Sequence, residues 1–435
     1  MRCCRSSKQR ASFGNSLLVL VDVGREDCHN ISCQATRRNF LRQIYTLVLA
    51  VVLCCLSGFS ASAIEFKNFS NQVILTPIAD DQYLYPDGTK VNLTNRLVVK
   101  TTGKVSKEQL KNIDQRVTTV QELYRLPSSA YYAVTFTDKR NIAEVLHRFE
   151  ISPLIDLAQP DLLQLQDESG RVGVPQQATE YIQKLNISSL WQKTKGENVK
   201  IAIIDDGFDL SHEDLEDINV AFSYDLDSKT LDASPRAPVD THGTQVSGII
   251  FAQHNSIGVD GIAPKAGFIA IRHTDTWTSK TLLSFYLAKL AGADIVNCSW
   301  NSSVLMQPLA DIINDLTTAG RQGKGIVLVF AAGNHGLILK ENYCEATLPR
   351  VLAVGAADLS GRRLPFSNYG PSVDIFTYGK NIQTLSSGPK KYAFFSGTSA
   401  SAAIVSGVVA LLLSQNRELT LTTLHEQLLL IFNAR

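Results

Sequence analysis

From about residue 178 to the C-terminus, short apolar runs alternate with longer helical segments, and this alternation constrains the fold more than any other feature. The apolar runs, which predict buried strands, are residues 199–205, 267–271, 294–298 and 325–330. The segments that predict helices are residues 280–291, 308–322, 398–414 and 421–431. Strands that alternate with helices form a parallel sheet with helices on both faces. We therefore predict one α/β domain over residues 178–435.

A smaller unit is predicted upstream, over residues 64–165. Its pattern predicts strands at 97–102, 117–126, 130–137 and 153–157, and helices at 107–114 and 141–149. This βαββαβ order is typical of a ferredoxin-like α+β domain, although many unrelated proteins share it. Residues 166–177 are polar and include D167-E168-S169-G170-R171, which predicts an exposed linker and a region for proteolytic processing.

Residues 36–63 have the features of an export signal, within a leader that covers residues 1–63. The basic stretch T36-R37-R38 precedes an apolar run over residues 44–59, and A61-S62-A63 follows. The arginine pair before F40-L41 resembles a twin-arginine signal, and an ordinary secretory signal is the alternative. An apolar run of about 16 residues is short for a membrane span. We expect export to the periplasm or the medium and no lasting span, and we assign no role to residues 1–35.

The charge balance and the absence of common motifs exclude several functions. The chain has 42 Lys and Arg against 41 Asp and Glu, a formal net charge of +1. Near neutrality there is no electrostatic reason to expect a nucleic acid partner. The sequence has no HExxH, paired CxxC, P-loop or dinucleotide motif, so the major alternative chemistries lack their signatures.

Cysteine usage indicates little about disulfides. Six of the eight cysteines precede the expected mature start, and only Cys298 and Cys344 follow it. Two cysteines do not make a disulfide framework. They could pair after export, but we expect two buried thiols.

Ser399 is the candidate nucleophile. It lies in F395-S396-G397-T398-S399-A400-S401, a run of small residues that opens an apolar helical segment. A helix N-terminus offers unpaired backbone N–H groups and a positive dipole end, which stabilise negative charge beside the hydroxyl. A serine needs a base near neutral pH, and the base needs a carboxylate to orient it. Taken alone, a serine in such a helix is more often a packing residue.

Asp205 and His242 can supply the carboxylate and the base. Four apolar residues lead into D205-D206-G207, which predicts a carboxylate at the C-terminal end of a buried strand, where open α/β sheets place their sites. His242 opens H242-G243-T244-Q245-V246-S247-G248, and its glycine neighbour lets another segment approach closely. The order Asp, His, Ser is one of three in which this catalytic geometry recurs. Taken singly, such an Asp or His is more often a helix cap, a turn former or a solvated residue.

Together the three motifs resemble those of the subtilisin family of serine proteases, the subtilases. D205-D206-G207 matches the family's aspartate motif, H242-G243-T244-Q245-V246-S247-G248 its histidine motif, and G397-T398-S399-A400-S401 its serine motif. The resemblance implies a subtilisin-like catalytic domain. It also implies that the upstream α+β unit is a propeptide, which acts as an intramolecular chaperone and inhibitor.

The resemblance also implies a role for Asn334. This residue follows the apolar run V329-F330-A331-A332-G333. In the family, the matching Asn donates its side-chain N–H to the oxyanion, alongside the backbone N–H of the nucleophile. Loss of one such donor typically lowers turnover roughly 100- to 1000-fold. Without the resemblance, an Asn after Gly is most often a turn residue.

The chain departs from the family pattern at the substrate cleft, for which the candidate residues are Ser299, Trp300, Asn301 and Gly333. The usual Ser-Leu-Gly-Gly is S299-W300-N301-S302 here. Position 301 thus gains a side chain where a substrate backbone should pair as an extra strand. We expect Trp300 and Asn301 to face the substrate and to narrow the range of substrates. The alternative is that Trp300 packs into the domain and Asn301 turns to solvent.

A structural calcium site is a further expectation from the resemblance. Q253-H254-N255-S256-I257-G258-V259 resembles a loop that binds calcium in many subtilases, and Asp214 matches the carboxylate that completes the site. A carboxylate, the Asn255 amide and backbone carbonyls are ligands that suit Ca²⁺. The alternative is a plain loop stabilised by Gly258 and hydrogen bonds.

These observations lead to one functional hypothesis and one rival. The hypothesis is an exported serine endopeptidase that acts on polypeptides through Asp205, His242 and Ser399, needs no cofactor for its chemistry, and removes its own propeptide. The rival is a non-proteolytic binding protein on a subtilase scaffold, which the changes at the cleft suggest. An intact set of catalytic residues argues against the rival.

Overall fold

The computed structural model describes residues 62–164, 171–172, 180–341 and 343–433. The leader with its signal, its six cysteines and most of the predicted linker therefore lie outside the described residues.

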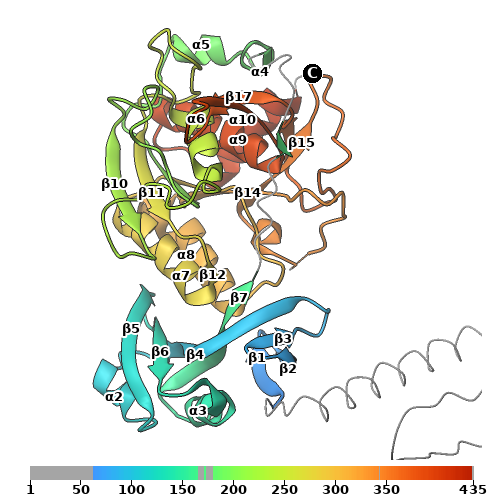
Figure 1. The fold of residues 1–435 in the computed structure, drawn as a ribbon. Coiled ribbons are helices and arrows are strands. Elements are labelled where there is room, and N and C mark those ends of the chain that lie inside the picture. The colour runs from blue at the N-terminus through green and yellow to red at the C-terminus, as the bar shows by residue number, and fades with distance from the viewer. Residues whose placement is uncertain (1–61, 165–170, 173–179, 342, 434–435) are drawn as a thin grey trace, which may run out of the picture. The chain divides into compact units, whose positions relative to one another are not determined.

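A seven-stranded parallel sheet forms the centre of the larger unit (Figure 1). The strands stand in the order β10-β11-β9-β13-β14-β15-β16, and every neighbouring pair is parallel. Their bounds are β9 (Lys200–Asp205), β10 (Val220–Asp225), β11 (Gly267–Arg272), β13 (Ile295–Cys298), β14 (Val327–Ala331), β15 (Val351–Ala357) and β16 (Ile375–Tyr378). The parallel α/β fold is confirmed, with three strands, β10, β15 and β16, that the apolar pattern did not predict.

Helices cover both faces of this sheet. Side chains of β9 alternate between two cores: Ile201 and Ile203 pack in one, and Ala202 and Ile204 pack in the other. The first core contains α4 (Glu180–Lys184), α5 (Ile187–Trp191), α6 (His242–Phe251), α9 (Thr398–Gln415) and α10 (Leu421–Asn433). The second contains α7 (Thr278–Leu290) and α8 (Gln307–Gly323). The predicted two-sided arrangement therefore follows from the period-2 burial of the strands.

The central helix α9 is apolar on nearly all sides. In the part of the chain that the structure describes, it is the one helix long and apolar enough to cross a membrane, and 89% of that stretch is buried inside the protein. Its small residues allow close packing, because a Cβ at Gly407 would lie only 2.7 Å from Ile262 Cβ. An all-round apolar helix of this kind is typical of a protein core.

A three-stranded antiparallel sheet leads into α9. It consists of β17 (Ile382–Leu385), β18 (Tyr392–Ser396) and β8 (Arg171–Val172), with β18 in the middle. Val172 pairs with Phe395, and Arg171 pairs with Ser396. The chain segment that follows the smaller unit therefore pairs with the strand that leads into Ser399.

The smaller unit has the predicted βαββαβ order. Its elements are β4 (Lys90–Thr101), α2 (Lys107–Lys111), β5 (Val117–Arg125), β6 (Ala130–Phe136), η1 (Lys139–Asn141), α3 (Ile142–Glu150) and β7 (Ile155–Gln164). The four strands are antiparallel in the order β7-β4-β6-β5. Three further strands, β1 (Ile64–Asn68), β2 (Asn71–Ala79) and β3 (Gln82–Leu84), precede them and continue the sheet from β4. The sequence pattern did not predict these three strands.

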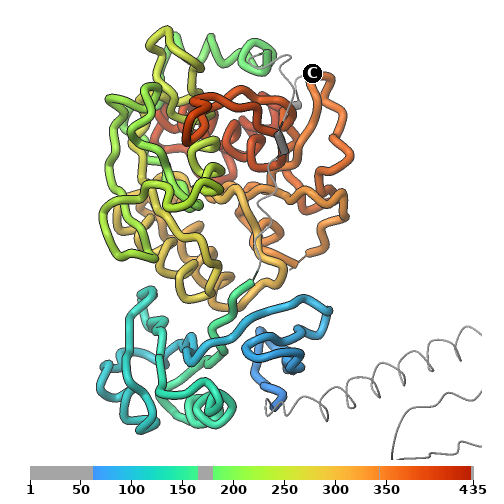
Figure 2. Tube along the Cα trace, in the orientation of Figure 1, coloured from blue at the N-terminus to red at the C-terminus, as the bar shows by residue number. Residues whose placement is uncertain are grey.

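The smaller unit contacts α7 through β5 and β7 and contacts α8 through hydrogen bonds of Tyr124 and Tyr131. Figure 2 gives the course of the chain through both units. The end of β7 pairs with β12 (Thr276–Trp277), immediately before α7. Neither α7 nor α8 has a cap from its own N-cap side chain. Instead, Asp161 Oδ1 accepts from Ser279 N at 2.8 Å, and Asn68 Oδ1 accepts from Gln307 N at 2.9 Å. Two side chains of the smaller unit thus cap two helices of the larger one.

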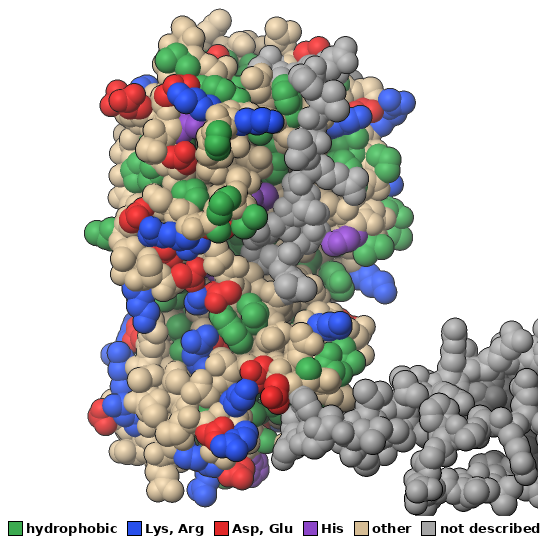
Figure 3. All heavy atoms as spheres, viewed as in Figure 1, with side chains coloured by type: hydrophobic (Ala, Val, Ile, Leu, Met, Phe, Trp, Pro, Cys, Tyr) green, Lys and Arg blue, Asp and Glu red, His purple; other side chains and the backbone are tan. Residues whose placement is uncertain are grey.

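Polar pairs hold the rest of this interface. Two aspartates on α8 accept hydrogen bonds of 2.6–2.8 Å. Asp311 accepts from the Tyr131 phenol and the Lys100 ammonium, and Asp315 accepts from the Tyr124 phenol and from Lys289 of α7. Figure 3 shows acidic and basic side chains interspersed over the face in view. That mixture agrees with the formal net charge of +1.

Candidate active site

The end of β9 and the start of α6 bring Asp205 and His242 together. His242 Nδ1 lies 2.8 Å and 3.0 Å from the two carboxylate oxygens of Asp205, and both residues are buried. A carboxylate can only accept a hydrogen bond, so Nδ1 carries the proton in this pair. The opposite nitrogen, Nε2, is then the basic end of a neutral imidazole.

Asp206, which the motif analysis did not single out, holds α6 in place. Its Oδ2 accepts from His242 N at 3.0 Å and its Oδ1 accepts from Gly243 N at 2.8 Å. Burial raises the pKa of Asp206 to about 7, and the adjacent Asp205 carboxylate acts in the same direction. The close approach predicted at Gly243 is present, because a Cβ there would lie 2.5 Å from Gly207 O. An acidic residue just before a turn is the signal that could have identified Asp206 as a helix cap.

Ser399 is the second residue of α9, directly after β18 and Gly397. Gly397 has a φ of 142°, a conformation that favours glycine at this turn. The Ser399 side chain is buried, and its Oγ donates to Ser299 O at 2.9 Å. The His242 ring packs edge-on against Phe395 of β18, with 5.4 Å between ring centroids. The three predicted residues therefore come from three separate elements, β9, α6 and α9, which meet beyond the C-terminal ends of the central strands.

Asn334 lies beside the start of α9. Its Oδ1 accepts from Thr398 N at 2.9 Å, which anchors the amide oxygen one residue before Ser399. The amide nitrogen Nδ2 of Asn334 therefore points away from Thr398 N. Gly333 has a φ of 98°, and a Cβ there would lie 2.5 Å from Asn368 Nδ2. Glycine is therefore required in this turn, and Gly333 supports Asn334.

A cavity of about 710 Å³ lies next to these residues. Asn301, Ser302 and Ser303 line one part of it. Other lining residues are His335, Gly336, Leu337, Ile338, Leu339, Lys340, Tyr343, Asn368 and Tyr369, with Asp87 from the smaller unit. The His335–Lys340 stretch directly follows Asn334, so the cavity adjoins the predicted oxyanion donor. A mainly apolar cavity of this size can take a substrate side chain.

Comparison with known proteins gives the family. The model of the "Subtilase family" matches residues 196–434, which include all four residues above. The chain belongs to the subtilase family. It is therefore a serine protease of the subtilisin type, with the corresponding α/β fold.

Two curated relatives indicate how far the similarity extends. This subtilase is 33% identical over 293 residues to a thermophilic serine proteinase of Bacillus sp. (strain AK1), covering 64% of this chain and 68% of that protein. It is 33% identical over 228 residues to subtilisin E of Bacillus subtilis (strain 168), covering 51% of this chain and 57% of that one. The subtilase thus spans little more than half the length of subtilisin E.

Solved structures show the same fold. Fervidolysin from Fervidobacterium pennivorans, described as a keratinolytic enzyme related to subtilisin, aligns over 83% of this chain and 61% of its own. The TM-score is 0.63 and the sequence identity is 19%. The MycP3 protease of the type VII (ESX-3) secretion system aligns over 61% of this chain and 87% of its own, with a TM-score of 0.52 and 24% identity. At such identities these likenesses concern the fold alone.

The prediction that Trp300 of this subtilase faces the substrate is wrong. Its side chain is fully buried, and its indole N–H donates to Ile204 O at 2.7 Å. The ring packs against Phe330 at 5.8 Å and against His273 at 6.0 Å, measured between ring centroids. A large apolar ring with a satisfied N–H is stable in a core, and here it leaves no surface for a substrate.

The other three cleft candidates of the subtilase differ in position. Asn301 lines the large cavity, and its Nδ2 donates to Ala331 O at 3.0 Å. Ser299 is buried, and its hydroxyl donates to Ser399 O at 3.2 Å, so it contacts the nucleophile's backbone rather than the cavity. Gly333 is buried in the turn before Asn334. Only Asn301 of the four lies at the cavity surface.

The residues expected to bind calcium fit that role in part. Asp214 is fully buried; its Oδ2 accepts from Val259 N at 3.0 Å, whereas its Oδ1 has no hydrogen-bond partner among the described residues. The Asn255 side chain lies close enough to lower the pKa of Asp214, which burial raises. No cluster of three His, Cys, Asp or Glu side chains occurs among the described residues. One buried carboxylate oxygen without a partner, with the Asn255 amide nearby, suits a hard cation.

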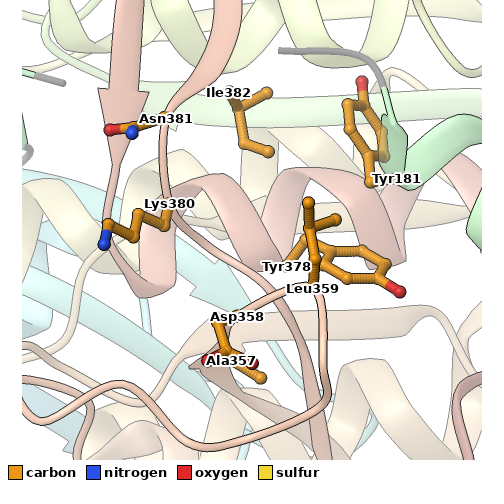
Figure 4. Close-up of a pocket in the computed structure, with 8 residues that line it drawn as sticks. All are labelled: Tyr181, Ala357, Asp358, Leu359, Tyr378, Lys380, Asn381 and Ile382. Atoms are coloured by element: carbon orange, nitrogen blue, oxygen red, sulfur yellow. The ribbon is translucent and has the colours of Figure 1, made fainter. Parts of the chain in front are cut away.

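A second cavity, of about 340 Å³, lies at the ends of β15 and β16 (Figure 4). Tyr181 of α4 and Tyr378 of β16 line it, with 6.5 Å between their ring centroids. Asp358 and Lys380 add charge to the lining. None of the residues predicted for catalysis lines this cavity.

Both cysteines of the larger unit are free and buried, as expected. Burial raises the pKa of the Cys298 thiol, and it raises that of Cys344 to about 12. Both are therefore protonated near neutral pH and unreactive.

Proposed function

We propose that this subtilase is an exported endopeptidase that cleaves polypeptides through Asp205, His242 and Ser399 and removes its own N-terminal unit. The observation that carries the catalytic part is the buried pair of hydrogen-bond distances between His242 Nδ1 and the Asp205 carboxylate. That pairing orients a histidine next to the strand and helix that carry the serine.

In the proposed reaction, His242 Nε2 takes the proton of the Ser399 hydroxyl as the oxygen attacks the scissile carbonyl. The hydroxyl turns from Ser299 O towards the imidazole, since catalytic hydrogen bonds often tighten only in the substrate complex. Asp205 keeps the tautomer and stabilises the imidazolium. His242 then gives the proton to the leaving amine, and water hydrolyses the acyl-enzyme.

Asn334 and the backbone N–H of Ser399 stabilise the oxyanion in this proposal. The bond from Thr398 N to Asn334 Oδ1 supports the assignment. It fixes the acceptor oxygen against α9, so the donor nitrogen Nδ2 is the end of the amide that faces away from α9. The start of α9 adds a positive dipole end beside Ser399. Donors that are fixed in advance need no reorganisation when charge develops.

A fluorophosphonate probe tests the catalytic proposal, because it reacts only with an activated serine. We expect one adduct, located by peptide mapping at Ser399, and loss of labelling in the His242→Ala variant. The rival, a binding protein without proteolysis, predicts a folded protein with no adduct. An adduct at another serine would exclude Ser399 as the nucleophile.

Self-processing is supported by the pairing of β8 with β18. Arg171 pairs with Ser396 in an antiparallel ladder, and Ser396 precedes Ser399 by three residues, so β8 lies beside the strand that leads into the nucleophile. We therefore expect the cut near Arg171, within residues 160–180. Mass spectrometry of wild type should give a mature N-terminus there, and Ser399→Ala should remain uncut. The same N-terminus in both would mean that another protease makes the cut.

Three further parts of the proposal concern export, inhibition and calcium binding. Export is proposed from residues 36–63, which combine a basic stretch, an apolar run and A61-S62-A63. An inhibitory role for the smaller unit is proposed from its contacts with α7 and α8. A structural Ca²⁺ at Asp214 and Asn255 is proposed from the buried Asp214 oxygen, and it takes no part in the chemistry.

A further inference from the structure

Glu345 is a buried carboxylate behind the large cavity that neither the catalytic residues nor Asn334 uses. It begins η2 (Glu345–Thr347) and its side chain is fully buried. Its Oε2 accepts from Ser302 N at 2.9 Å, whereas its Oε1 is buried and has no hydrogen-bond partner among the described residues. Unsatisfied buried oxygens are rare in native proteins because they lower stability, and they often mark a functional role.

The bond to Ser302 connects Glu345 to the substrate cleft. Residues 299–302, here named the pocket-edge segment, end at Ser302, and Asn301 and Ser302 both line the cavity. The first residue of the segment, Ser299, accepts the hydrogen bond from Ser399 Oγ. A shift of Ser302 would therefore move one wall of the cavity. Through Ser299 it would also change the hydrogen bond that Ser399 Oγ donates.

Each residue of the pocket-edge segment donates a hydrogen bond to a group outside the segment, and the acceptor of that bond is here called its anchor. The Ser299 hydroxyl donates to Ser399 O, the Trp300 indole to Ile204 O, and the Asn301 amide to Ala331 O. Those three acceptors are neutral backbone carbonyls. The anchor of Ser302 is the carboxylate of Glu345, so it is the one of these four anchors that can change its charge.

The elements around Glu345 bring no competing charge. η2 packs against α8, β14 and β15, and both strands contain only apolar residues. Glu345 acts electrostatically on the thiols of Cys298 and Cys344, whose raised pKa values keep them neutral. The charged groups of α8 bond elsewhere: Asp311 and Asp315 to the smaller unit, and Arg321 to carbonyls of residues 325, 417 and 419.

We propose that Glu345 is a positioning residue for substrate binding, which in its ionised form holds Ser302 and the cavity wall and on protonation loosens them. The proposal rests on the proposed protease function. Burial raises the pKa of Glu345, so protonation begins at a less acidic pH than for an exposed Glu. A hydrogen bond to an ionised acceptor is roughly twice as strong as a neutral one. Loss of the charge should thus weaken substrate binding more than it slows the chemical steps.

The test is the pH dependence of KM and kcat for a peptide substrate between about pH 5 and pH 9, in wild type and two variants. We expect the wild-type KM to rise about fivefold towards acid pH. Glu345→Gln keeps an acceptor for Ser302 N and cannot ionise, so its KM should not change with pH. Glu345→Ala removes the acceptor and should raise KM at every pH. If the Ala variant does not fold, Glu345→Gln alone decides.

Asp374→Asn is the matched control. Asp374 is also a carboxylate with a raised pKa that accepts a backbone N–H, from Ala353 at 2.8 Å, but it directly precedes β16 and does not line the large cavity. Its KM profile should remain that of wild type. An acid rise in KM that persists in Glu345→Gln, or no such rise in wild type, would overturn the proposal. Fluorophosphonate labelling of Ser399 in the same samples separates this result from failure of the protease proposal.

Discussion

Two adjacent aspartates at the end of β9 have different tasks. Asp205 bonds the imidazole side chain of His242, and Asp206 bonds the backbone N–H groups of His242 and Gly243. The first interaction sets the tautomer of the ring, and the second sets the position of the helix that carries it. Because both carboxylates are buried side by side, the charge of Asp205 makes ionisation of Asp206 less favourable.

The raised pKa of Asp206 predicts a pH effect on stability. The pKa is about 7 in the folded state against 3.8 for an ordinary Asp side chain, so between these values the folded protein binds more protons than the unfolded chain. The free energy of unfolding therefore falls as pH rises through this range. Asp206→Asn removes this dependence and also disturbs one backbone bond, which costs about 1 kcal/mol. Denaturant titrations should show the difference, wild type minus Asp206→Asn, decreasing from pH 4 to 7; a flat or rising difference would contradict the account.

Asn301 and Trp300 should respond differently to substitution. Asn301→Gly removes a side chain at the cavity surface and should alter side-chain preference, by an amount of about 1–3 kcal/mol between substrates. Trp300→Leu leaves a void in the core and should lower the free energy of unfolding by roughly 3 kcal/mol, with an unchanged preference. Cleavage profiling on a peptide library and denaturant unfolding measure both variants. A changed preference in Trp300→Leu alone would mean that the indole reaches the substrate.

At the scale of elements, α7 and α8 depend on the smaller unit for their first turns. Asp161 accepts from both the amide and the hydroxyl of Ser279, at 2.8 Å and 2.7 Å, and is also paired with Arg96. Asn68 gives α8 the corresponding cap. Since both helices also pack against the sheet, these caps connect folding of the smaller unit to order in the larger one.

Removal of one cap should loosen one helix only. In Asp161→Ala, hydrogen exchange should become faster in the first turn of α7, and the free energy of unfolding should fall by about 1–2 kcal/mol. Asn68→Ala is the control, and it should affect the start of α8 but not that of α7. Exchange measured by mass spectrometry on the uncut Ser399→Ala protein keeps the smaller unit present. Equal effects of both variants on both helices would mean that the caps act only through global stability.

The loop after α6 should respond to calcium. A cation that pairs the buried Asp214 oxygen stabilises only the folded state, by about 2.7 kcal/mol at a concentration 100 times its Kd. We expect a chelator to lower Tm, added Ca²⁺ to restore it, and Asp214→Asn to abolish the response. A Tm that is insensitive to both chelator and Ca²⁺ would show that the loop needs no cation.

At the scale of the whole molecule, the sequence predicts what local patterns can carry. Strands such as β9, with buried residues on both faces, and the long helices α7–α10 were predictable because each signal lies within one segment. The edge strand β10 and the short strand β16 were not, since their apolar runs are too brief to distinguish from loops. The N-terminal β1–β3 also escaped prediction.

In the candidate site, too, the residues with a local sequence signal were predictable and those that depend on distant contacts were not. Asp205, His242, Ser399 and Asn334 could be predicted because each sits in a distinctive local motif. The burial of Trp300 could not, because it depends on Phe330, His273 and Ile204, which come from other strands and their ends. Glu345 acts through a single backbone bond to a distant segment, and no sequence pattern marks such a contact. Asp206 could have been identified as a helix cap from its place just before a turn.

The central claim is that Asp205, His242 and Ser399 act as one catalytic unit, and the most direct measurement is the turnover of Ser399→Ala on a peptide substrate. The account predicts a folded protein whose kcat falls on the order of 10⁶-fold, and it predicts that adding His242→Ala lowers the rate little further. Cleavage by Ser399→Ala at a rate near that of wild type would contradict it.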